Sequence, residues 1–77
     1  MTRELVEYLA RQLVDDPAAV SVEELSGEEG SILRLHVAPD DLGKVIGRGG
    51  RIARALRTLA RASAGRVQQR VTLEIVE

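Results

Sequence analysis

The sequence of 77 residues has no cysteine and no apolar stretch long enough to cross a membrane, and both absences narrow the possibilities. Without cysteine, neither a disulfide nor a thiolate metal site can form. Charged residues interrupt the first fifteen positions, so these positions cannot serve as a leader or a membrane segment. We therefore expect a protein of the reducing cytoplasm that does not contact a membrane.

Length and charge indicate what kind of chain remains. Seventy-seven residues suit one small domain, which we expect to span residues 1–77. The net charge of −1 hides a sharp division along the chain. Residues 1–42 contain three basic and ten acidic residues, whereas residues 43–77 contain eight basic and two acidic residues. The C-terminal half therefore has the charge that attracts an anionic partner.

The first helix is predicted from apolar residues that recur at helical spacing from Leu5 to Val14. Thr2 is placed to cap this helix, and Pro17 should end it, because proline restricts the residue before it. A turn rich in glycine and glutamate at residues 26–30 then separates two segments that alternate between apolar and polar residues. These segments predict two strands joined as a hairpin.

The first of these strands includes Val22, but Glu24 occupies its next inward position, so we expect a bulge or an early end there. The second strand places alternate residues from Leu33 to Val37 on one face and ends before Pro39. Its other face carries Ile32, Arg34 and His36.

A short helix is predicted to begin at Asp40 and Asp41, whose charge complements the helix dipole, and to end on Gly47. A longer helix follows and closes at Gly65. We expect one face of this longer helix to be buried, namely that of Ile52, Leu56, Leu59, Ala60 and Ser63. Alternation from Val71 to Ile75 predicts the last strand.

The expected order is therefore αββααβ, which is an α+β arrangement in two layers. The first two strands should form an antiparallel hairpin. The second and third strands are joined through two helices and should lie parallel. This order predicts a three-stranded mixed sheet with its helices packed on one face.

The segment Gly43–Ile52 organises the chain. It has an apolar approach, a four-residue break at Gly47–Gly50 and then an arginine-rich helix. Glycine is required where the backbone takes a positive φ or where another backbone comes close. The N-terminus of the following helix, with its outward N–H groups and its dipole, attracts an anion.

Other glycine motifs fit these residues less well. A dinucleotide-binding GxGxxG would require glycine in place of Ile52, and no GxxxxGK followed by serine or threonine occurs. A turn that only joins two packed helices would explain the glycines but would leave the surrounding basic residues unexplained.

The segment Asp41–Arg51, with Gly47–Gly50 as a GXXG loop, resembles KH domains, and Ala55–Leu59 after it strengthens the likeness. The αββααβ order resembles the type II KH arrangement over essentially the whole chain. The sequence is most similar to the small bacterial single-domain KH proteins of the KhpA group. KH domains clamp the backbone of about four nucleotides with this loop.

The resemblance implies a protein that holds single-stranded RNA, as an RNA chaperone or post-transcriptional regulator. It implies an RNA site made of Lys44, Val45, Ile46, Gly47, Arg48, Gly49, Gly50, Arg51 and Arg54. Tyr8 is the single aromatic residue, so stacking platforms are not available and each site should bind weakly. The resemblance further implies a homodimer or a heteromer with another KH-containing protein.

Catalysis and cofactor binding have little support in the sequence, and we expect no enzyme, no metal and no cofactor. His36 is the lone histidine and suits an ordinary sheet face. Asp40 and Asp41 suit a helix start more than a facing acid pair. The alternative to RNA binding is a protein-pairing module that uses a KH-like frame and binds little RNA itself.

Overall fold

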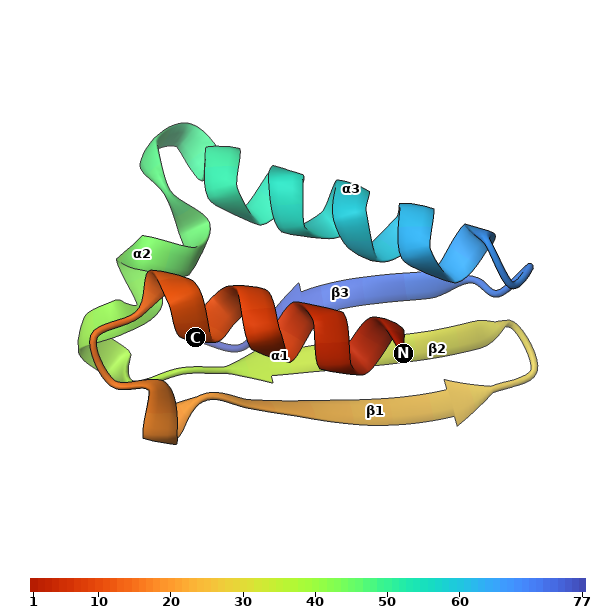
Figure 1. The fold of residues 1–77 in the computed structure, drawn as a ribbon, viewed down its shortest axis with the longest axis horizontal. Coiled ribbons are helices and arrows are strands. Elements are labelled where there is room, and N and C mark those ends of the chain that lie inside the picture. Colours follow the sequence, from red (N-terminus) through yellow and green to blue (C-terminus); the bar gives the residue numbers. More distant parts are fainter.

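The computed structural model describes residues 1–77, and its elements follow one another in the predicted αββααβ order (Figure 1). The helices are α1 (Thr2–Leu13), α2 (Leu42–Ile46) and α3 (Arg51–Gly65). The strands are β1 (Ser21–Gly27), β2 (Gly30–His36) and β3 (Val71–Ile75). Short 3-10 turns lie at Pro17–Ala19, Pro39–Asp41 and Arg48–Gly50.

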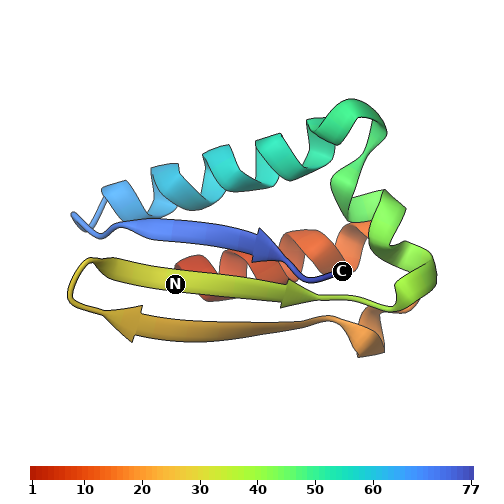
Figure 2. The same ribbon diagram turned by 180° about the vertical axis from the view of Figure 1, so that it is seen from behind.

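The three strands form one mixed sheet in the order β1-β2-β3. Strands β1 and β2 are antiparallel and pair Val22 with Leu35, whereas β2 and β3 are parallel and pair Leu33 with Leu73. Helices α1 and α3 lie side by side over one face of the sheet, and the other face is uncovered (Figures 1 and 2). The α+β class, the mixed sheet and the single helical layer predicted from the sequence are confirmed.

The hydrophobic core lies between this helical layer and the sheet. Its residues alternate along the strands and recur every three or four positions along the helices, as the two periods require. The largest fully buried side chains are those of Leu33, Leu35, Val6 and Val45. Because Val45 belongs to α2, the short helix before the glycine loop is anchored in the same core as the sheet.

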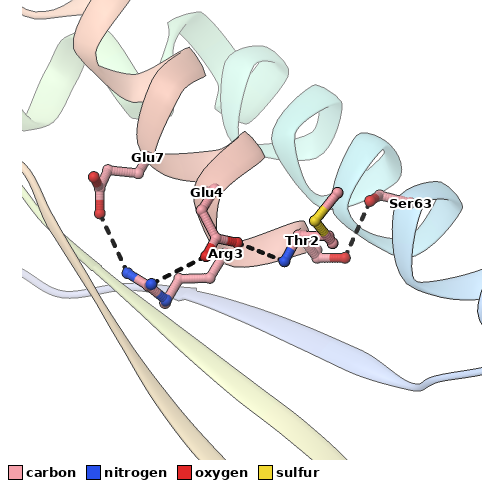
Figure 3. A network of polar contacts seen from close by, with 6 residues as sticks. Thr2, Arg3, Glu4, Glu7 and Ser63 are labelled. Atoms are coloured by element: carbon pink, nitrogen blue, oxygen red, sulfur yellow. Dashed lines mark hydrogen bonds and ion pairs between the residues drawn. The ribbon is translucent and has the colours of Figure 1, made fainter.

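Thr2 does not cap α1, so that prediction is wrong. The N-cap position is held by Met1, and Thr2 is a buried residue of the first helical turn. Its Oγ1 shares a hydrogen bond of 3.0 Å with Oγ of Ser63 on α3 (Figure 3). The hydroxyl is therefore used between the two helices instead of at the end of one.

Two further expectations are corrected. Strand β1 has no bulge, because its pairing with β2 runs without interruption from Ser21 to Gly27. Val22 is the only buried residue of this edge strand, so Glu24 reaches solvent from the inward face without a distortion. Leu59 is 46% exposed and lies at the margin of the buried stripe of α3, which consists of Ala53, Leu56, Ala60 and Ala64.

Candidate nucleic-acid interface

The glycine loop connects α2 to α3 at one end of the helical layer (Figure 1). Helix α2 ends at Gly47, whose N–H donates to the carbonyl oxygen of Gly43 at 2.8 Å. A single 3-10 turn follows, closed by the N–H of Gly50 donating to the oxygen of Gly47 at 3.1 Å. Gly47, Gly49 and Gly50 have φ values of 76°, 64° and 78°, so three of the four loop residues need the freedom of glycine.

The glycines differ in what surrounds them. A Cβ added to Gly47 would lie 2.5 Å from Cγ1 and 2.9 Å from the backbone nitrogen of Ile52, so this position is closed on its inner side. Around Gly49 and Gly50 no heavy atom would lie within 4 Å of an added Cβ. The outer side of the loop is therefore open to an approaching backbone.

The side chains expected to form the site lie in two different settings. Arg48 and Arg51 are exposed at the loop, and Arg54 donates from Nη2 to the oxygen of Gly49 at 3.3 Å. Val45 is fully buried, whereas Ile46 is half-buried beside the loop. The structure thus brings the three arginines and Ile46 to the surface around the loop and places Val45 behind it, in the core.

Lys44 is held by two carboxylates. Its Nζ lies 3.2 Å from Oδ2 of Asp15 and 3.3 Å from Oδ1 of Asp41. These carboxylates, that of Asp15 first, raise the pKa of Lys44. Burial alone would raise the pKa of Asp41, but the backbone N–H groups of Asp16 and Asp15, together with Lys44, outweigh that effect and lower it. Both groups therefore stay charged at neutral pH.

Asp41 has a structural role beyond the helix start expected from the sequence. Its side chain caps no N–H of α2 and is instead 2% exposed, accepting hydrogen bonds from the backbone N–H of Asp15 at 3.2 Å and of Asp16 at 3.0 Å. These partners precede it by about 25 residues in the chain. No local pattern in the sequence could signal contacts over that separation.

The arginines of the C-terminal half have no carboxylate partners. Arg3, Arg11, Arg34 and Lys44 all form ion pairs. Those without an ion pair are Arg48, Arg51, Arg54, Arg57, Arg61, Arg66 and Arg70. No acidic residue occurs between Asp41 and Glu74, so the loop, α3 and the turn after it form an uncompensated positive region.

Arg57 and Arg61 lie farther along α3 than the loop. Arg57 Nε donates to the carbonyl oxygen of Leu73 on β3 at 3.3 Å. With Arg61, Val71 and Thr72, these residues line a small cleft of about 160 Å³ between α3 and β3. Arg57 is thus a link between helix and strand as well as a surface cation, which the sequence pattern alone did not indicate.

A hollow of about 640 Å³ lies between the β1–β2 turn and the residues at the start of β3. In Figure 1 this turn lies at the opposite end of the sheet from the glycine loop. There a Cβ added to Gly30 would lie 2.5 Å from the oxygen of Arg70, which accepts the N–H of Ser31 at 2.9 Å. This hollow lies where the β1–β2 turn packs against the segment that leads into β3. The electrostatics favour the glycine loop as the site instead.

The structure contains no group of three or more histidine, cysteine, aspartate or glutamate residues that could hold a metal ion. His36 lies on the open sheet face, with Nε2 3.6 Å from Oε1 of Glu23. None of the helices has the length and apolar character needed to span a bilayer.

Comparison with known proteins decides the family. A family model described as "KhpA/KhpB, KH domain" matches residues 3–75. The chain belongs to this KH family. The resemblance noted in the sequence is confirmed, and the αββααβ fold is that of its type II arrangement.

Relatives in the KhpA/KhpB family cover the chain almost completely. A protein of Treponema pallidum named "RNA-binding protein KhpA" is 56% identical over 77 residues, which are 100% of this chain and 96% of that protein. One of the same name from Caldanaerobacter subterraneus is 52% identical over 73 residues, covering 95% of this chain and 97% of its own. Both names describe RNA-binding proteins.

A solved structure shares the fold. A chain in the crystal structure of Aquifex aeolicus Era bound to GDP.AlF4- matches with a TM-score of 0.62 and 19% sequence identity. The match covers 96% of this chain but 29% of that chain. At this identity the likeness concerns the fold alone.

Proposed function

We propose that this chain binds single-stranded RNA by holding the sugar-phosphate backbone in the loop Gly47–Gly50. The observation that carries the proposal is the open glycine loop at the head of a helix whose arginines lack carboxylate partners. The relatives named RNA-binding protein KhpA support the same ligand.

The chemistry of the site suits phosphate. Gly49 and Gly50 leave room for a backbone to approach, and the positive end of the α3 dipole faces the loop. Arg48, Arg51 and Arg54 surround that point and offer planar donors that match phosphate oxygens. Ile46 provides apolar surface on which a base can rest, and Val45 supports it from the core.

Binding at this one site should be weak and dependent on salt. Tyr8, the single aromatic residue, lies on α1 and not at the loop. If three arginines each neutralise one phosphate, the slope of log K against log salt is about −2, from about −0.7 per phosphate of a single strand. Backbone binding without base stacking suits an RNA chaperone or post-transcriptional regulator that acts on many sequences.

A second role, pairing with another copy or with another KH-containing protein, is favoured by the exposure of Tyr8 (61%) and Leu59 (46%) on the helices. A dimer would join two weak loops and gain affinity through avidity. Leu59→Gln, which leaves the charge of α3 unchanged, should then lower the mass measured by light scattering without changing the affinity for an RNA that spans one loop.

The experiment for RNA binding is fluorescence anisotropy with short single-stranded RNA at low and moderate salt. Arg48→Asp with Gly49→Asp should abolish binding while circular dichroism stays that of the natural fold, because aspartate is among the few residues that tolerate the left-handed backbone of Gly49. The matched control is Arg66→Asp with Gly65→Asp, which makes the same charge change at the far end of α3, where Gly65 has open space. If the control loses as much affinity as the loop variant, or if neither loses any, the loop is not the RNA clamp.

A further inference from the structure

We infer that Asp41 is a positioning residue for the glycine loop: its buried carboxylate ties the chain after α1 to α2 and holds Lys44 as part of that tie, away from RNA. This inference deepens the proposed function and rests on it. It assigns Lys44 a supporting role, in contrast to the phosphate contact expected from the sequence.

The geometry of the tie uses both carboxylate oxygens. Oδ1 accepts the N–H of Asp15 at 3.2 Å and Oδ2 accepts the N–H of Asp16 at 3.0 Å, while Lys44 donates to Oδ1 at 3.3 Å. No buried side-chain nitrogen or oxygen in the structure lacks a partner, so this buried charge is fully satisfied. The chain between α1 and β1 is thereby attached to Asp41, the residue directly before α2, and it passes beside α2 in Figure 1.

The loop needs such support because α2 has only five residues. A helix that short is not stable by itself and depends on tertiary contacts. One contact is Val45, which inserts into the core, and the Asp41 tie is another. Since three of the four loop residues are glycines with wide conformational freedom, the direction of the loop depends on the helix that precedes it.

Lys44 differs from every arginine around the loop. Two carboxylates lie within 3.3 Å of its ammonium group, whereas Arg48, Arg51 and Arg54 have no ion pair. Asp15 is also well exposed and would repel a phosphate that approached Lys44. The charge of Lys44 is therefore neutralised by its carboxylate partners, whereas the charges of Arg48, Arg51 and Arg54 are available to an approaching anion.

Asp41→Asn separates this inference from its rival by the sign of the effect. If Asp41 only withheld Lys44 from RNA, removing its charge would release the lysine and tighten binding. If Asp41 positions the loop, the same substitution weakens RNA binding by about fivefold or more, the lower end of usual coupling between sites. Binding that is unchanged or tighter in a folded Asp41→Asn chain overturns the inference.

Lys44→Met gives a second readout that keeps the inference testable even if Asp41→Asn unfolds. As a supporting residue, Lys44 can be lost with a drop in affinity but no change in the salt slope, and Lys44→Arg should restore affinity. As a phosphate contact, its loss would make the slope shallower by about 0.7. Arg51→Met is the matched control, since it should lose that slope increment.

Amide hydrogen exchange tests the tie without RNA. Lys44→Met and Asp41→Asn should speed exchange at residues 45–52 while β2 and β3 keep their protection. If RNA binding by the natural chain proves independent of the loop, the proposed function fails and exchange alone decides the tie. If binding depends on the loop but exchange there is unaltered in both variants, the tie fails and the proposed function stands.

Discussion

Helices α1 and α3 share one face of the sheet and a similar buried stripe, yet they treat their charges in opposite ways. On α1, Arg3 pairs with Glu4 and Glu7, and Arg11 pairs with Glu7 at 2.7 Å (Figure 3 draws the first two pairs). On α3, four arginines occur and no acidic residue. The positive charges of α1 are thus neutralised by acidic residues of the same helix, whereas those of α3 are not and create a positive electrostatic potential at its surface.

The difference is not a matter of stability. Exposed ion pairs of the kind found on α1 contribute about 0–1 kcal/mol each, so α3 forgoes little by lacking them. Like charges three or four positions apart, such as Arg57 and Arg61, even destabilise a helix by about 0.2–0.5 kcal/mol. A helix that keeps such repulsion and no partner acid is suited to an anionic ligand that relieves it.

Charge reversal on the two helices should break this comparison most visibly. Arg51→Glu with Arg54→Glu should weaken RNA binding about 100-fold, because each charged contact is worth about 1.5 kcal/mol or more and every 1.4 kcal/mol is tenfold. Arg3→Glu with Arg11→Glu makes the same change of net charge on α1 and should alter binding little at physiological salt, where charges beyond about 8 Å are screened. Anisotropy titrations of both folded variants give the ratio of their affinities for RNA. Equal losses would mean that overall charge, and not the face of α3, governs binding.

The loop that presents α3 can be tested through two glycines of the same region. Gly47 has φ 76° and ψ 169°, a conformation that only glycine adopts readily, and its inner side abuts Ile52. Gly47→Ala should therefore lower the free energy of unfolding by about 3 kcal/mol and remove RNA binding. Gly43→Ala, inside α2 with open space around it, should instead stabilise by about 0.5–1 kcal/mol. Urea unfolding measures both, and a mild effect at Gly47 would contradict the described loop backbone.

Much of this arrangement was predictable because it depends on residues close in sequence. The periodicity of the helices and strands, and the break at Gly47–Gly50, are local signals, and the structure confirms the elements that they predict. What failed was set by distant partners. Thr2 forms a hydrogen bond with Ser63, and Asp41 accepts hydrogen bonds from the chain after α1. Neither contact is indicated by residues nearby in the sequence.

The predicted burial of Leu59 is wrong for a related reason. Helical spacing places it next to the buried stripe of α3, but how far a helix sinks into its neighbours is decided by tertiary packing. The glycines and arginines that the sequence predicts as an RNA site lie near one another around the loop. The sequence could not distinguish the neutralised Lys44 from the arginines without an ion pair, because the distinction requires the positions of Asp15 and Asp41.

Lowering the pH should show a difference between two carboxylates, Glu4 on α1 and Asp41 before α2, in how much each contributes to stability. Glu4 is exposed, and its pKa is lowered chiefly by a hydrogen bond from the N-terminal ammonium group, whereas the pKa of Asp41 is lowered by hydrogen bonds that join two parts of the fold. A lowered folded-state pKa gives stability that is present above the unfolded-state pKa and is lost as pH falls through the folded-state pKa. Stability should therefore decline below the ordinary range of aspartate.

Asp41→Asn should flatten that acid limb, while Glu4→Gln should leave most of it, because an exposed pair near a fraying terminus contributes little. Urea unfolding midpoints measured from neutral pH down to about pH 2 would show the two slopes. The difference in unfolding midpoint between the natural chain and Asp41→Asn should be smallest near that acid end. There the natural chain loses the charge of Asp41 by protonation, and the variant has already lost it by substitution. A natural chain and an Asp41→Asn chain with parallel pH profiles would mean that the buried carboxylate is not coupled to folding.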